Sequence, residues 1–197
     1  MNDQVLASIC EHQQMVRELK ALVPEITRLA TDMVNTLKHG GKILWMGNGG
    51  SAADCRHLAA ELVGRFERER PGLAAIALTT DTSIMTSIGN DYGFEHIFNR
   101  QIEALCRPED LVLALSTSGN SENVLTALVT AKQIGAYCAG LTGHEGGMLP
   151  DHCDLCLRIP SSRTARIQEG HLLIGHMLCD LVESETMPPD SPHGQSL

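Results

Sequence analysis

The sequence predicts an α/β fold, a three-layer sandwich in which a five-stranded parallel sheet lies between helices, with further helices at the N-terminus. Two observations predict it. After residue 41, short apolar runs alternate with longer stretches of helical periodicity. The apolar runs are continuous, which is typical of parallel strands buried on both faces. A chain of 197 residues, 43% of them hydrophobic, is long enough for one domain with a complete core.

The first forty residues are expected to be helical. Apolar residues recur there at three- and four-residue steps from Val5 to Leu37. Pro24 should divide this region into two helices and lie in the first turn of the second. We interpret residues 1–40 as a helical segment that packs in an oligomer, and residues 41–185 as the main part of a single domain. Residues 186–197 hold three prolines and are expected to form a disordered tail.

The alternating part of the chain provides the sheet and its covering helices. Strands are predicted at Ile43–Met46, Ala74–Leu78, Leu111–Leu115, Ala136–Leu141 and Leu155–Ile159. Helices are predicted near Ser51–Arg65, Ser83–Gly89, Glu95–Leu105, Ser121–Ile134 and Ala165–Glu185.

Composition excludes several classes of protein. A formal net charge of -9 argues against a nucleic-acid partner, because the chain has no basic excess to neutralise phosphates. No apolar stretch has the length of a membrane span, and the acidic and polar N-terminus does not resemble a signal peptide. Seven cysteines without a disulfide-like spacing favour a reducing, cytoplasmic location.

A glycine-rich loop follows the first predicted strand. The segment Asn48-Gly49-Gly50-Ser51 opens the next helix, where backbone N–H groups and close approach suit an anionic ligand. The loop also satisfies a dinucleotide-binding fingerprint through Ala52, which is a weak signal on its own. A tight strand-to-helix turn without a ligand remains the alternative.

A second loop, rich in hydroxyls, follows the third strand. Ser116, Thr117, Ser118 and Ser121 surround Gly119 and precede a helix. Helix capping explains one hydroxyl, which we assign to Ser121, whereas four suit a neutral phosphate cradle. Ligands of open α/β sheets lie at the carboxyl ends of the strands, so both loops should meet in one crevice.

Asn90 and Asp91 are expected near the rim of the same crevice. They follow the second strand and a short helix. An Asx turn before Gly93 explains them equally well.

A possible metal site involves two distant helices. His57 and Glu61 are four residues apart, on one helix face, and offer ligands that suit zinc. Gln168 and His176 on the last helix would complete the set. Eight helical residues rise about 12 Å, which is close to the summed reach of both side chains, so one straight helix brings both to one ion only with difficulty. Either that helix begins late or bends, or the two residues come from different subunits, which we favour.

Other residues carry weaker signals. Cys153 and Cys156 form a single C-x-x-C pair, which we interpret as two buried thiols at a strand rather than as a zinc site. An exposed His–Glu pair on a solvated face remains the simpler explanation of His57 and Glu61 taken alone.

Taken together, these segments resemble the phosphoheptose isomerases of the sugar isomerase (SIS) fold, which is flavodoxin-like. The resemblance covers nearly the whole chain in order. It rests on the glycine-rich loop (Gly47-Asn48-Gly49-Gly50-Ser51-Ala52), His57-x-x-x-Glu61, Gly89-Asn90-Asp91, the hydroxyl-rich loop (Ser116-Thr117-Ser118-Gly119-Asn120-Ser121), Leu141-Thr142-Gly143, and Arg166-Ile167-Gln168-Glu169 with His171 and His176. Some members place an acid where this chain has Ala165.

The resemblance implies a homotetramer that isomerises sedoheptulose 7-phosphate, a phosphorylated seven-carbon sugar, to D-glycero-D-manno-heptose 7-phosphate for lipopolysaccharide core synthesis. It implies one zinc ion (Zn2+) per subunit. The metal ligands would be His57, Glu61, Gln168 and His176. The substrate-binding residues would be Asn48, Gly49, Gly50, Ser51, Glu61, Asn90, Asp91, Ser116, Thr117, Ser118, Ser121 and Gln168. We expect Glu61 to act as general base and His176 as general acid in an enediol mechanism.

Two alternatives remain at this stage. A non-catalytic relative similar to the DnaA initiator-associating proteins shares both loops, but its counterpart of Glu61 lacks the carboxylate. A dinucleotide-binding oxidoreductase would use the glycine loop, with Asp81 at the end of the second strand as the ribose-binding acid.

Overall fold

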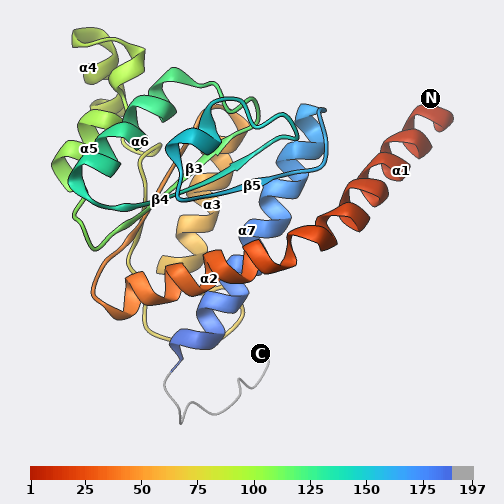
Figure 1. Cartoon of the computed structure of the whole chain (residues 1–197), viewed down its shortest axis with the longest axis horizontal. Coiled ribbons are helices and arrows are strands. Elements are labelled where there is room, and N and C mark those ends of the chain that lie inside the picture. Colours follow the sequence, from red (N-terminus) through yellow and green to blue (C-terminus); the bar gives the residue numbers. More distant parts are fainter. Residues whose placement is uncertain (188–197) are drawn as a thin grey trace.

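The computed structural model describes residues 1–187 and has the predicted three layers (Figure 1). All five strands are parallel, and their order in the sheet is β2-β1-β3-β4-β5. The strands are β1 (Ile43–Gly47), β2 (Ala75–Ala77), β3 (Leu111–Ser116), β4 (Tyr137–Thr142) and β5 (Leu155–Arg158). This order is that of flavodoxin-like folds and confirms the predicted fold class.

Helices account for most of the remaining chain. They are α1 (Asn2–Glu18), α2 (Val23–Lys38), α3 (Gly50–Val63), α4 (Thr82–Asp91), α5 (Asn99–Leu105), α6 (Glu122–Ile134) and α7 (Thr164–Thr186). Three short 3-10 turns are η1 (Leu19–Leu22), η2 (Phe94–His96) and η3 (Leu149–His152). The helix predicted at Glu95–Leu105 was wrong in its first half, because the chain turns inward there to bury Ile97 and Phe98.

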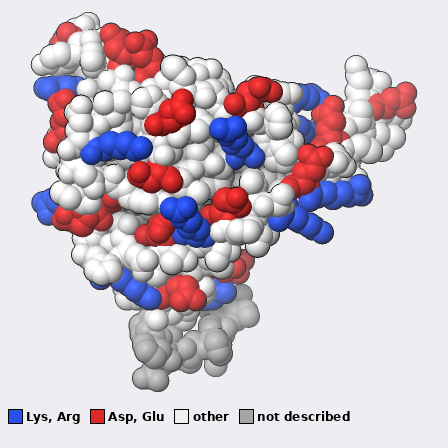
Figure 2. All heavy atoms as spheres, viewed as in Figure 1, with Lys and Arg blue, Asp and Glu red and all other residues white. Residues whose placement is uncertain are grey.

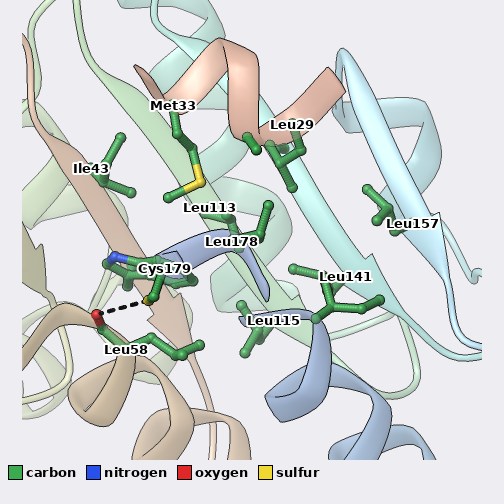
Figure 3. Close-up of a cluster of buried hydrophobic side chains, with 14 of the residues drawn as sticks. Leu29, Met33, Ile43, Leu58, Leu113, Leu115, Leu141, Leu157, Leu178 and Cys179 are labelled. Atoms are coloured by element: carbon green, nitrogen blue, oxygen red, sulfur yellow. Dashed lines mark hydrogen bonds between the residues drawn. The ribbon is translucent and has the colours of Figure 1, made fainter. Parts of the chain in front are cut away.

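The sheet is covered on both faces because its strands are apolar throughout. Along β1, Ile43 and Trp45 belong to the core beneath α2, α3 and α7, whereas Leu44 and Met46 belong to the core beneath α5 and α6. All four side chains have no exposed surface. Figure 3 shows the first of these cores, where Cys179 on α7 contacts the carbonyl of Leu58 on α3. Each such side chain contributes about 1.5–3 kcal/mol by leaving water.

The N-terminal region begins outside this body. Pro24 lies in the first turn of α2, as predicted, and α2 packs within the core of the same chain. In contrast, α1 extends away from the sheet (Figure 1). Its Met15 is buried, but Val5 and Ile9 are 59% and 49% exposed. The helix α7 ends at Thr186. The predicted tail, residues 186–197, therefore lies almost wholly outside the described residues, which end at 187.

The surface offers no single-sign field on the face shown in Figure 2, where acidic and basic side chains are interspersed. None of the helices in residues 1–187 combines the length and the apolar character needed to cross a membrane.

Candidate active site

The two predicted loops meet where the strand order reverses, between β1 and β3. Both strands end there, with Gly47 paired to Leu115. The side-chain amides of Asn48 and Asn123 pair with each other through two hydrogen bonds of 2.9 Å, which join the glycine loop to the first turn of α6. In flavodoxin-like sheets this switch point is the usual place for a ligand.

The glycine loop needs its glycines for two separate reasons. Gly49 has a φ of 56°, in the left-handed region that favours glycine. At Gly50 a Cβ would strike the side-chain amide of Gln168, which lies over the start of α3. No side chain caps α3, whereas Asp81 caps α4 by accepting from the Ile84 N–H at 2.9 Å. The first N–H groups of α3 are therefore left for a ligand.

The serine-rich loop differs from its prediction at one residue. Ser121 stands at the N-cap of α6, but its hydroxyl makes no bond to that helix and instead lies 3.1 Å from the Ser116 hydroxyl. Ser116 also accepts from the N–H of Gly119, and Ser118 accepts from that of Asn120. The predicted cap was wrong because the Ser121 side chain turns toward the loop. Hydroxyls and free helix N–H groups consequently face the same space.

His57, Glu61 and His176 come together in one chain. The Nε2 atoms of His57 and His176 are 2.8 Å apart, and the two rings meet edge to face. On the other side of the His57 ring, Nδ1 lies 3.5 Å from a carboxylate oxygen of Glu61. The predicted face of α3 therefore does meet α7, and neither His57 nor Glu61 stands alone on a solvated surface.

The fourth expected ligand lies two turns away. Helices α3 and α7 run side by side in the same direction, since Gln168 lies over Gly50 and Gly175 packs on Leu58. A late start of α7 is ruled out, because the helix begins before Gln168. Gln168 and His176 thus remain about 12 Å apart along the helix axis. One chain brings three of the four expected ligands together.

The donor set suits a divalent metal ion, although the side chains form a row. Two imidazole nitrogens that face each other, with a carboxylate beside them, are the donors that zinc prefers. His57 lies between Glu61 and His176, so no three His, Cys, Asp or Glu side chains within residues 1–187 surround one point.

Asp54 is a site residue that the sequence analysis missed. It lies three residues before His57 on the same face of α3, and one of its carboxylate oxygens is buried without a partner. Burial raises the pKa of Asp54, while His57 and His176 lower it in part. The spacing of Asp54, His57 and Glu61 along one helix face was the available signal.

A buried ion pair supports the loop that lies beside His176. The Phe66 ring lies 5.5 Å from the His176 ring, in the loop that follows α3. Glu183 on α7 fixes that loop by accepting from the N–H groups of Phe66, Glu67 and Arg68 at 2.8–2.9 Å. The Arg70 Nε lies 3.1 Å from the same carboxylate, and both side chains are at most 1% exposed.

Two other candidate segments lie apart from this cluster. Asn90 and Asp91 are the last two residues of α4 and do not form the Asx turn that was the alternative. Both are exposed, and the Asn90 side-chain amide donates to the Asp91 carboxylate at 2.7 Å. Within residues 1–187, neither side chain is hydrogen bonded to the other candidate residues. Cys153 and Cys156 are free thiols just before and within β5, so the strand was predicted correctly, but both thiols are only partly buried rather than buried.

Comparison with known proteins agrees with this architecture. The family model of the SIS domain matches residues 9–143. A phosphoheptose isomerase of Geotalea daltonii is 52% identical over 184 residues, which are 93% of this chain and 96% of that protein. That of Trichlorobacter lovleyi is 57% identical over 171 residues, 87% and 86% of the two chains.

Solved structures agree in fold as well as in sequence. The phosphoheptose isomerase of Neisseria gonorrhoeae has a TM-score of 0.88 at 44% identity, covering 93% of this chain and 98% of its own. That of Francisella tularensis has a TM-score of 0.90 at 41% identity, covering 92% and 97%. These similarities set aside the regulatory and the dinucleotide-binding alternatives. The chain belongs to the phosphoheptose isomerases, enzymes of the SIS domain family.

Proposed function

We propose that His57, Glu61 and His176 form the active site in which this enzyme converts sedoheptulose 7-phosphate to D-glycero-D-manno-heptose 7-phosphate. One observation carries the assignment of the site. The helices α3 and α7, which are far apart in the sequence, place the imidazoles of His57 and His176 2.8 Å apart, with Glu61 beside them. His57 and Glu61 both lie on α3, the helix that follows the glycine loop. The product would supply heptose for lipopolysaccharide core precursors.

Glu61 and His176 divide the proton transfers between them. Glu61 removes the proton from C1 of the ketose and returns it to C2 of the aldose, through an enediol or enediolate. His176 protonates the oxygen on C2, where the carbonyl of the ketose becomes a hydroxyl, and takes up the proton that the C1 hydroxyl loses when C1 becomes the aldehyde. A base and an acid at fixed positions contribute about 10²–10⁴-fold each to such a reaction.

The serine-rich loop binds the phosphate at the other end of the sugar. Ser116, Thr117, Ser118 and Ser121 supply hydroxyls, and the uncapped start of α6 supplies N–H groups. The glycine loop, from Asn48 to Ser51, with Gln168 and the Asn90-Asp91 pair would contact the sugar hydroxyls. A neutral cradle of this kind binds a dianion without the basic side chains that an acidic chain lacks.

Zinc is the proposed cofactor, one ion per subunit. His57, Glu61 and His176 would hold it, together with Gln168 of the partner subunit, because the distance along α7 separates the two residues within one chain. When bound, such an ion polarises a carbonyl and stabilises the negative charge of an enediolate. Lining up the sugar and moving its protons remain the work of the side chains described above.

The oligomer is proposed to be a homotetramer in which α1 packs against other copies of the chain. Val5, Leu6 and Ile9 are 49–59% exposed on a helix that leaves the body of the protein (Figure 1). Exposed apolar clusters of this kind favour a protein partner. A cytoplasmic location is part of the proposal, since all seven cysteines are free thiols.

An isomerase assay on sedoheptulose 7-phosphate tests the function and the metal together. Activity should disappear after exhaustive chelation and return when zinc is added. No turnover with zinc present would contradict the function, and full turnover after chelation would contradict the metal.

Light scattering on a Val5→Glu/Ile9→Glu double variant tests the oligomer. The variant should dissociate and lose activity, while Val129→Glu, at a residue 39% exposed on α6, should do neither. An intact tetramer in the double variant would remove α1 from the interface.

A further inference from the structure

Cys153 and Cys156 lie on the same face of the sheet, outside the proposed active site. Cys156 in β5 pairs in register with Gly140 in β4, so its side chain lies on the face where Gly140 has none. A Cβ at Gly140 would be 2.9 Å from the Cys153 sulfur. The missing side chain of Gly140 therefore makes room for the Cys153 thiol directly beside Cys156.

The turn between the two cysteines is held in place. Asp154 donates its N–H to the Cys138 carbonyl at 2.7 Å and accepts the Cys138 N–H on its carboxylate at 2.8 Å. The Lys132 ammonium lies 3.6 Å from the other carboxylate oxygen. These contacts tie the turn to β4 and so hold the two cysteines that flank Asp154 and Leu155 next to that strand.

The two thiols differ in chemistry. A hydrogen bond from Cys153 lowers the pKa of Cys156 despite its burial, and Arg158 lowers it further. That hydrogen bond and burial raise the pKa of Cys153. Both residues are free and only partly buried. A partly buried thiol with a lowered pKa and a second thiol beside it have the attributes of a redox-active pair.

The pair also lies behind the serine-rich loop. Leu149 packs over Gly140 next to Cys153. The Leu149 N–H donates to the Gly119 carbonyl at 3.0 Å, and the Met148 N–H donates to Asn120 at 3.1 Å. Leu149 therefore connects Cys153 to the loop that contains Ser116 and Ser121.

We propose that Cys153 and Cys156 form a reversible dithiol–disulfide site whose oxidation changes the mobility of the serine-rich loop. Its reaction partner is a small-molecule disulfide. The Cys156 thiolate attacks one sulfur of that disulfide, forms a mixed disulfide and releases one small thiolate, which takes up a proton. The Cys153 sulfur then attacks Cys156, loses its own proton and releases the second small thiol. The protein loses two hydrogens, and the disulfide is reduced to two thiols.

The test uses the reduced full-length protein and glutathione disulfide. Mass spectrometry should find the loss of two hydrogens and a cross-link between Cys153 and Cys156, both reversed by dithiothreitol. Cys153→Ser, which keeps a hydroxyl donor beside Cys156, should trap glutathione on Cys156. That reaction should be about tenfold faster than trapping on Cys153 in Cys156→Ser. Cys106→Ser, a partly buried thiol on the same face of the sheet, is the matched control and should leave the cross-link unchanged.

Two outcomes would overturn the proposal. If glutathione attaches to the exposed Cys10 while Cys153 and Cys156 stay reduced, the pair is a structural element of the core. If the cross-link forms but amide hydrogen exchange across residues 116–121 is the same in both redox states, the connection to the serine-rich loop is wrong. Faster or slower exchange there in the oxidised protein, restored by dithiothreitol, is the expected result. Neither readout depends on isomerase activity.

Discussion

Two clusters of charged and polar side chains join the α3 region to α7, and they differ in almost every property. His57, Glu61 and His176 are partly exposed, and within residues 1–187 their side chains form no hydrogen bonds or ion pairs beyond those of the row. Arg70 and Glu183 are buried, and Glu183 lies about two turns beyond His176 on α7. The Glu183 carboxylate accepts hydrogen bonds from three backbone N–H groups. A ligand can reach the first cluster from solvent, whereas the second cluster is buried.

The difference separates function from support. A buried ion pair whose carboxylate accepts three backbone N–H groups holds a loop in place, but it is closed off from a substrate. Partly exposed imidazoles beside a carboxylate are poor contributors to stability and good acid–base groups. Phe66 links the two clusters, because Glu183 fixes the backbone of this residue and its ring lies against His176.

Removal of the proposed base should have the largest effect on activity. Glu61→Gln keeps the shape of the side chain but cannot accept a proton from carbon, so turnover should fall by about 10²–10⁴-fold. Binding of the sugar phosphate and the free energy of unfolding should change little. Steady-state kinetics and urea unfolding on the same preparations make the comparison, and near-normal turnover would remove Glu61 from its role.

Breaking the buried pair should have the largest effect on stability. Glu183→Ala leaves the Arg70 charge buried without compensation, at a cost of about 3–5 kcal/mol in the free energy of unfolding. Urea denaturation measures it. A loss below 1 kcal/mol would show that the loop is held by other contacts.

Acid should destabilise the protein through a third residue on α7. His171 has no exposed surface, and burial lowers its pKa from 6.5 to about 4. Between these two pH values His171 binds a proton in the unfolded chain but not in the folded chain. The free energy of unfolding therefore falls as the pH drops from 6.5 to about 4. The loss amounts to about 3 kcal/mol at most. In His171→Leu, unfolding free energies at pH 7 and pH 5 should lie closer together than in the parent, and an unchanged difference would mean that other groups cause it.

The smallest effect is expected at the edge of the buried pair. Asp180 bonds Arg68 and is 47% exposed. Asp180→Asn should cost no more than about 1 kcal/mol, because exposed ion pairs are weak. If Asp180→Asn lowered the free energy of unfolding as much as Glu183→Ala, the expectation that buried ion pairs matter more here than exposed ones would be wrong.

Periodicity predicted the strands and helices well because burial on both faces leaves a clear trace in the sequence. The helix predicted at Glu95–Leu105 began too early, since Ile97 and Phe98 are buried in a turn before α5 whose apolar spacing resembles that of a helix. The Ser121 cap was wrong because its side chain can choose between the helix and Ser116, and local sequence does not decide.

The candidate site was only partly readable in the sequence. His57 and Glu61 were found because four-residue spacing defines one helix face. The pairing of His57 with His176 depends on how α3 and α7 pack, which no local pattern contains. Arg70 and Glu183 look like ordinary surface charges in the sequence, and only the fold buries them.

Solvent hydrogen exchange tests the central claim most directly, because it follows the proton that Glu61 is proposed to carry. Sedoheptulose 7-phosphate would be incubated in deuterated water with the parent enzyme or with Glu61→Gln, and deuterium at C1 and C2 measured by mass spectrometry. We predict deuterium in the sugar with the parent enzyme and almost none with the variant. Equal incorporation by both proteins would contradict a catalytic role for this cluster.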